Sequence, residues 1–248
     1  MGKVYLVGAG PGDPELLSLK AFRLLKEADV ILVDELVLGV RDMIPPGKRV
    51  INVGKSGKEG GKRTSQAEIN RLMVELARKY ECVVRLKGGD PFIFGRGGEE
   101  AEFLREHGVE FEVVPGISAA TAVPAFFGSP LTHREYASAL TILTGHGKEE
   151  GGAGEERESV NWSAVAKLRG TIVILMGVGT LERNVRRLLE AGMPAETPVA
   201  ILEKGFTPEA RAIVGTLGDI VEKARKNSVE PPAVVVIGDV VRLHEKLL

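Results

Sequence analysis

The sequence predicts an α/β protein made of two domains, each with its own sheet. Short runs rich in valine and isoleucine alternate with amphipathic stretches, and glycine-rich segments follow several of the runs. A proline- and glycine-punctuated stretch then interrupts this alternation near the middle of the 248 residues. We therefore expect one α/β domain over residues 1–115 and a second over residues 116–248.

The N-terminal half contains alternating strands and helices, which predicts a largely parallel sheet. Ser65 and Glu68 have the spacing of a capping box and mark the start of one helix. The expected helices span 15–28, about 65–76 and 98–106, and the expected strands span 4–7, 30–33, 49–53, 82–86 and 111–114.

The C-terminal half repeats the alternation less regularly. Residues 203–209 are too few for a crossover helix, so some of the later strands are expected to be antiparallel. The polar segment 148–159 has no periodicity and is typical of a solvated loop. The expected strands span 140–143, 171–175, 198–202, 210–214 and 233–237, with helices near 181–190 and 217–225.

The composition excludes several classes of protein. With 33 Lys and Arg against 34 Asp and Glu, the net charge of -1 provides no global attraction for nucleic acid or an anionic membrane. Cys82 has no second cysteine to pair with, and no apolar run reaches the roughly 18 residues of a membrane span. The four histidines do not combine with Cys82 into a metal-ligand spacing. We expect a cytoplasmic protein with no metal, nucleic acid or membrane partner.

A first glycine-rich loop, Gly8–Pro14, lies between the first strand and the first helix, where open α/β sheets approach their ligands. Its third glycine comes one residue too early for the dinucleotide fingerprint, and its two prolines remove backbone donors. A nicotinamide cofactor is therefore disfavoured. The loop alone is equally consistent with a simple turn and with a ligand loop.

A second loop follows the strand at 82–86 and contains five glycines, two phenylalanines and Arg96 before Glu100. Such a loop is costly to order, which favours a role in ligand binding over a plain connection. Asp90 is suited to accept hydrogen bonds from ribose hydroxyls or an amine, although aspartate before proline is also an ordinary turn residue.

Asp34 follows the second strand and Lys55 follows the third, so both are expected at one edge of the sheet. A carboxylate and an ammonium in one cleft suit proton transfer or an ionic substrate, but a turn aspartate and a solvated lysine are the simpler interpretation of the spacing alone. Six cations lie within residues 48–63 of a nearly neutral chain, which indicates a small polyanionic ligand or a solvated loop.

Taken in order, these motifs resemble the tetrapyrrole methylase family, and most closely its uroporphyrinogen-III C-methyltransferases. The resemblance covers nearly the whole chain. The stretches that carry it are Val7–Pro14 with Leu17–Ala21, Val53–Lys55, Arg85–Glu100, Val114–Ala120, Pro130–Arg134, Thr144–Gly147 and Leu175–Gly177.

The resemblance implies two α/β domains with S-adenosylmethionine bound in the cleft between them, usually in a homodimer. Ser118 stands where many relatives have threonine and keeps the hydroxyl. By position, the cofactor contacts fall on Pro11, Gly88, Gly89, Asp90, Ile93, Ser118, Ala119, Met176 and Gly205.

The resemblance also implies methylation of uroporphyrinogen III at C2 and C7 to give precorrin-2, on the path to siroheme and cobalamin. Asp34 is then the expected base and Lys55 its acidic partner. Cations would hold the rim of this polycarboxylate by charge-assisted hydrogen bonds. The expected substrate contacts are Lys58, Arg63, Arg96, Thr132, His133 and Arg134, with Lys62 nearby.

Three alternatives remain at this stage. An enzyme of the same fold acting on a later corrin precursor would share the cofactor loops and differ in its substrate contacts. A binding module without catalysis is disfavoured because both Asp34 and Lys55 are present. A nicotinamide-dependent dehydrogenase is disfavoured by the glycine spacing.

Overall fold

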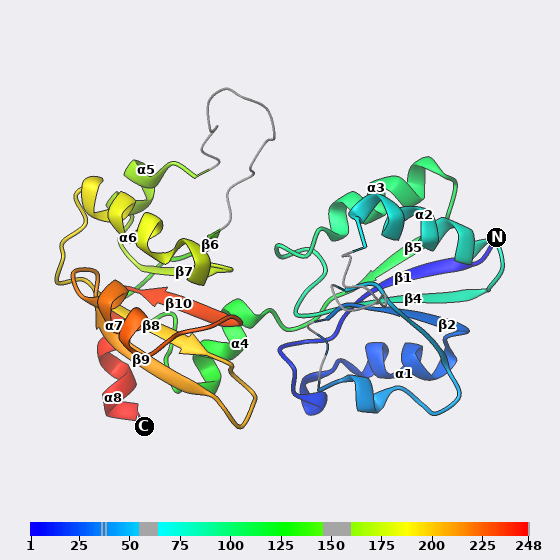
Figure 1. Cartoon of the computed structure of the whole chain (residues 1–248), viewed down its shortest axis with the longest axis horizontal. Coiled ribbons are helices and arrows are strands. Elements are labelled where there is room, and N and C mark those ends of the chain that lie inside the picture. The colour runs from blue at the N-terminus through cyan, green and yellow to red at the C-terminus, as the bar shows by residue number, and fades with distance from the viewer. Residues whose placement is uncertain (36, 38, 55–63, 146–159, 248) are drawn as a thin grey trace. The chain divides into compact units, whose positions relative to one another are not determined.

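The computed structural model of the chain describes residues 1–35, 37, 39–54, 64–145 and 160–247. They form two compact units, Met1–Ser118 and Ala119–Leu248, each an α/β domain with a five-stranded sheet (Figure 1). The boundary expected from the sequence after residue 115 lies three residues before this division. No helix in the described part of the chain is long and apolar enough to cross a membrane.

The first unit has an all-parallel sheet in the order β3-β2-β4-β1-β5. α1 lies on one face and α2 and α3 lie on the other (Figure 1). β2 is buried along its whole length, as expected for a strand of a sheet covered on both faces. The elements are β1 (Lys3–Gly8), α1 (Leu19–Glu27), β2 (Val30–Val33), β3 (Arg49–Asn52), α2 (Gln66–Ala77), β4 (Cys82–Lys87), α3 (Gly97–Glu106) and β5 (Phe111–Val114).

Two helix starts show how local hydrogen bonds set the boundaries. The capping box predicted at Ser65 and Glu68 is present, with both reciprocal hydrogen bonds. The first helix was expected from residue 15, but α1 begins at Leu19 because Ser18 caps it by accepting the backbone N–H of Ala21 at 3.2 Å. The residues Pro14–Leu16 form a separate 3₁₀ turn.

The second unit has a mixed sheet in the order β6-β7-β10-β8-β9. β10 runs antiparallel to both neighbours and β9 antiparallel to β8, which confirms the expectation for the later strands. The elements are α4 (Ala119–Phe126), β6 (Leu140–Thr144), α5 (Trp162–Lys167), β7 (Thr171–Leu175), α6 (Leu181–Glu190), β8 (Pro198–Glu203), β9 (Arg211–Thr216), α7 (Ile220–Lys226), β10 (Ala233–Ile237) and α8 (His244–Leu247).

Helices cover both faces of this second sheet. Buried side chains of α5, α6 and α7 form one core with the sheet, and this core contains Trp162, the single tryptophan of the chain. α4 packs on the other face. The sequence did not predict α5. α7 begins at Ile220, after the N-cap Asp219, rather than at residue 217, because Leu217 and Gly218 are still in a loop whose backbone bonds to the loop before β8.

Three loops at the carboxyl edge of the first sheet pack backbone against backbone at Gly8, Gly89 and Gly116. A Cβ on Gly116 would lie 2.2 Å from the carbonyl oxygen of Gly89 and 2.8 Å from the Cα of Gly8. Gly10 and Gly89 also exchange backbone hydrogen bonds of 3.2 and 2.8 Å. Glycine is needed here because there is no room for a side chain between the loops after β1, β4 and β5.

Replacing Gly116 with alanine should separate these loops. We expect Gly116→Ala to lower the free energy of unfolding by about 2–3 kcal/mol. The atoms that the new Cβ would meet belong to the backbone, so they cannot move away by a change of side-chain rotamer. Urea unfolding followed by circular dichroism measures the change.

Gly98→Ala is the matched control, since a Cβ at Gly98 in the first turn of α3 meets no atom within 4 Å. It should leave stability unchanged or raise it by up to about 1 kcal/mol. Equal stability of the two variants would contradict the close packing at Gly116.

Candidate active site

Asp34 lies at the carboxyl end of β2, where its backbone N–H donates to the carbonyl of Leu86 at 3.2 Å. Its Oδ1 accepts a hydrogen bond from Nη2 of Arg85 at 2.7 Å. The Asp34 side chain is 30% exposed, whereas that of Arg85 is 2% exposed. The carboxylate thus has a buried cation behind it and solvent in front of it.

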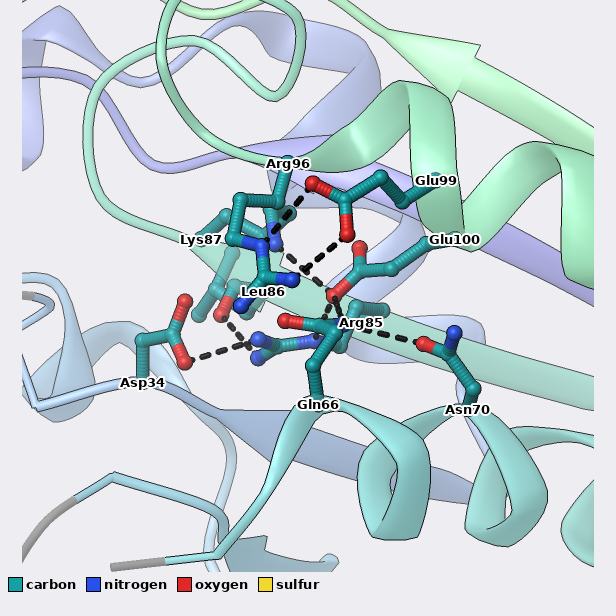
Figure 2. A network of polar contacts seen from close by, with 9 residues as sticks. All are labelled: Asp34, Gln66, Asn70, Arg85, Leu86, Lys87, Arg96, Glu99 and Glu100. Atoms are coloured by element: carbon teal, nitrogen blue, oxygen red, sulfur yellow. Dashed lines mark hydrogen bonds and ion pairs between the residues drawn. The ribbon is translucent and has the colours of Figure 1, made fainter. Parts of the chain in front are cut away.

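Arg85 belongs to a buried network of charged side chains (Figure 2). Arg85 and Lys87 are two residues apart on β4 and point to the face that α2 and α3 cover. Glu100 of α3 is fully buried, and its Oε1 accepts from Nε of Arg85 at 3.2 Å and from Nζ of Lys87 at 2.9 Å. Gln66 of α2 donates to the same oxygen at 3.1 Å.

The charges in this network balance as two cations and two carboxylates. Burial, together with the positive charge of Arg85, lowers the pKa of Lys87. Among the described residues, Oε2 of Glu100 is buried without a hydrogen-bond partner, so all the contacts of this carboxylate converge on Oε1. The network joins β2, β4, α2 and α3 at one end of the sheet.

Asp90 ties two of the glycine-containing loops together. Its Oδ1 accepts the backbone N–H of Phe92 at 2.8 Å, and its Oδ2 accepts that of Gly116 at 3.1 Å. Because both oxygens already bind backbone, Asp90 holds the loop after β4 against the loop after β5. Several of the expected cofactor residues belong to the joined loops at this edge. They are Pro11, Gly88, Gly89, Asp90 and Ser118.

Beyond Asp90, the same loop presents apolar side chains to solvent. Phe92 is 56% exposed, and Ile93 and Phe94 are 40% and 42% exposed. Arg96 has a φ of 58° and forms a forked ion pair with Glu99, at 3.0 and 2.5 Å. The Arg96 side chain is 54% exposed, as a substrate contact should be, but a substrate carboxylate would have to compete with Glu99.

In the second unit, Met176 and Gly205 lie at one edge of the sheet. They follow β7 and β8, whose last residues pair with Val234 and Ala233 at the start of β10. Met176 has a φ of 54° and is 47% exposed. A Cβ on Gly205 would lie 3.0 Å from the side chain of Val123, so α4, which begins at Ala119, packs against this turn.

Glu203, two residues before Gly205, holds the start of this turn through two hydrogen bonds. Arg211 donates to its Oε2 at 2.7 Å, and the backbone N–H of Glu230 donates to its Oε1 at 3.1 Å. Burial alone would raise the pKa of Glu203, but these hydrogen bonds outweigh it and the pKa is lowered.

The expected substrate residues Thr132, His133 and Arg134 lie in a turn closed by two backbone hydrogen bonds between His133 and Ala137. Nδ1 of His133 accepts the backbone N–H of Glu135 at 3.2 Å, which leaves the other ring nitrogen to carry the proton. Thr132 and Arg134 are exposed. This turn precedes β6, whereas Met176 and Gly205 follow strands parallel to β6, so the sheet does not bring the two groups to one edge.

The remaining expected site residues, Lys55, Lys58, Lys62 and Arg63, lie outside the described residues. Val53 and Gly54 precede them, and a Cβ on Gly54 would lie 2.8 Å from the Cβ of Glu35. Within the described ranges, no group of three or more histidine, cysteine, aspartate or glutamate side chains is arranged to hold a metal ion.

Residues 3–221 match the family model described as Tetrapyrrole (Corrin/Porphyrin) Methylases. The chain belongs to the tetrapyrrole methylase family. It is 51% identical over 247 residues to the S-adenosyl-L-methionine-dependent uroporphyrinogen III methyltransferase of Methanosarcina barkeri, covering 99% of this chain and 94% of that one. It is 48% identical to the uroporphyrinogen-III C-methyltransferase of Methanocaldococcus jannaschii, covering 98% of each.

The fold matches that of solved family members. A crystal structure of uroporphyrin-III C-methyltransferase from Thermus thermophilus, complexed with S-adenyl homocysteine, aligns with a TM-score of 0.79 and 44% identity. The alignment covers 98% of this chain and 100% of that one. The family and the two-domain α/β fold expected from the sequence are thus confirmed.

Sequence reasoning assigned no role to Arg85, Lys87 or Glu100, although all three stand in a stretch that it singled out. The signal was available in β4, where two cations two residues apart interrupt an apolar strand. Buried strands rarely carry unpaired charges, so a carboxylate partner elsewhere was to be expected. That this partner is Glu100 depends on how α3 packs, which the pattern does not determine.

The lowered pKa of Glu203 predicts acid sensitivity in the second unit. A carboxyl group whose pKa is lower in the folded state stabilises the fold above its unfolded pKa of about 4.3, and this stabilisation is lost as the pH falls through the folded value. We expect Glu203→Gln to be less stable than the wild type at pH 7 and the difference to narrow between about pH 5 and pH 3.

Thermal unfolding followed by the fluorescence of Trp162 reports on this unit, because Trp162 lies in its core. Melting temperatures that fall in parallel for wild type and variant across this pH range would contradict the assignment.

Proposed function

We propose that this protein transfers methyl groups from S-adenosylmethionine to C2 and C7 of uroporphyrinogen III, giving precorrin-2, a precursor of siroheme and cobalamin. The observation that carries the proposal is the position of Asp34. Its partly exposed carboxylate lies at the same sheet edge as the joined glycine loops and pairs with buried Arg85. The two relatives at 48–51% identity, which match over nearly their whole length, support the same reaction.

The described residues fit S-adenosylmethionine as the methyl donor. The contact of Gly8, Gly89 and Gly116 leaves backbone rather than side chains at the edge of the first sheet, where an extended ligand can approach closely. Exposed Ile93 offers apolar surface beside it, and Asp90 fixes the loops. In the second unit, Met176 and Gly205 provide a further apolar side chain and a turn without a side chain.

When bound, S-adenosylmethionine supplies an activated methyl group with its own leaving group. The chain's own residues then have to position the acceptor carbon and remove the proton that leaves the methylated macrocycle. Asp34 is the proposed base, with Lys55 as its acidic partner. The substrate's carboxylates need cationic partners. Arg96 and Arg134 have exposed side chains, and Lys58 and Arg63 are proposed as further contacts.

The proposal includes a homodimeric assembly and a cytoplasmic location, both of which rest on the family resemblance and on the sequence. Thr132 and His133 remain proposed substrate contacts from the exposed turn before β6.

The reaction is tested by incubating the purified protein with S-adenosylmethionine and enzymatically generated uroporphyrinogen III under anaerobic conditions. We expect the product mass to rise by two methyl groups, with an accompanying change in absorbance. Precorrin-2 offered as the acceptor is the comparison. Methylation of precorrin-2 but not of uroporphyrinogen III would show that the acceptor is a later corrin precursor.

Asp34→Asn should lower kcat by about 100-fold or more, because asparagine keeps the shape but cannot accept the proton. The dissociation constant of S-adenosylmethionine, measured by calorimetry, should stay within about twofold, since Asp34 lies outside the joined glycine loops. Turnover equal to that of the wild type would remove Asp34 from the mechanism.

A further inference from the structure

We propose that Arg85 is a positioning residue for the reaction: it fixes one oxygen of the Asp34 carboxylate and thereby directs the other toward the substrate. This inference rests on the proposed role of Asp34. Arg85 itself touches neither substrate nor cofactor in this proposal, because its side chain is buried beneath Asp34.

The geometry gives the guanidinium of Arg85 a fixed plane. Its Nη2 donates to Asp34 at 2.7 Å, while a second nitrogen, Nε, donates to Glu100 at 3.2 Å. A third contact, from Nη1 to the carbonyl of Leu86 at 3.4 Å, is longer. A planar, rigid fork held through two nitrogens by two carboxylates cannot rotate without losing one of its partners.

The anchor behind Arg85 is itself immobilised. Glu100 is fully buried, and the oxygen that binds Arg85 also accepts from Lys87 and from Gln66. Gln66 is the first residue of α2 and also donates to Asn70 at 2.9 Å, so the network ends in two helices. A shift of Arg85 would therefore disturb three other segments of the unit.

Asp34 is the member of the network that needs this anchor. It stands just after β2 rather than within it, and its side chain is the most exposed of the four charged groups. Figure 2 shows one oxygen of Asp34 directed at Arg85 and the other pointing away from it. The second oxygen is then the one available to accept a proton.

Stability alone gives no sufficient reason for the network. Removing two charges from water is expensive, and well-packed apolar residues in place of a buried ion pair are often equally stable. The chain nevertheless places two cations and a carboxylate inside a largely apolar layer, and the network reaches solvent at Asp34. The arrangement is explained if the buried network serves to orient a reactive carboxylate.

A double-mutant cycle tests the proposal, with Arg85→Gln, Asp34→Asn and the double variant compared with the wild type. We expect Arg85→Gln to lower kcat by about 10- to 100-fold, with KM and the affinity for S-adenosylmethionine within about threefold. In the Asp34→Asn background, Arg85→Gln should lower kcat no further, because the group through which it acts is already lost.

Losses that multiply in the double variant would overturn the proposal, since Arg85 would then act independently of Asp34. A folded Arg85→Gln protein with wild-type kcat would overturn it as well, and so would an Asp34→Asn protein with wild-type kcat. Failure of the proposed function is a separate result, because it appears in the wild-type assay as no methylation of uroporphyrinogen III.

Two further variants separate positioning from folding. Arg85→Lys keeps the buried charge but lacks the fork, so it should fold and still lose kcat, and it can replace Arg85→Gln in the cycle. Asp29→Ala is the control for general destabilisation. Asp29 accepts the backbone N–H groups of Glu81 and Cys82 at the opposite edge of the sheet, and its loss should lower the melting temperature while kcat at 25 °C stays unchanged.

Discussion

The contact of three glycines at the carboxyl edge of the first sheet is the constraint on which the candidate site depends. Loops from β1, β4 and β5 approach so closely that a single Cβ would force them apart. Asp90 completes the arrangement by binding the backbone of two of these loops. The close approach needs the absence of side chains, and the shared carboxylate keeps the loops from separating.

A second constraint lies beneath this edge, in the balance of buried charges. The chain is nearly neutral overall, yet two cations and two carboxylates are concentrated where β2, β4, α2 and α3 meet. Leaving any of the three buried members, Arg85, Lys87 or Glu100, unpaired would be strongly destabilising. The same balance that the fold requires therefore also holds one oxygen of Asp34.

Much of the fold could be predicted because its local signals agree. The apolar run of β2, the capping box at Ser65 and the short connection after β8 each indicated the element that the structure contains. The start of α1 was misplaced because Leu16 and Leu17 continue the apolar pattern, and only the cap at Ser18 ends it. For the site, glycine-rich sequence indicated ligand loops but could not show that Asp90 binds backbone. Which carboxylate pairs with Arg85 depends on how α3 packs against β4, and here it is Glu100.

The order of strands in the first sheet also has a consequence for folding. β1 lies between β4 and β5, so the first strand of the chain finds its neighbours only after some eighty to more than a hundred further residues are present. Pairings between residues so distant in sequence form slowly, because a long loop must close before any contact is gained. The junction of Gly8 with Gly116 spans nearly the whole unit, and its completion should be a late step in folding. The ability to hold a ligand would then arise only when the entire unit is assembled, so a partly folded chain would not sequester a reactive methyl donor.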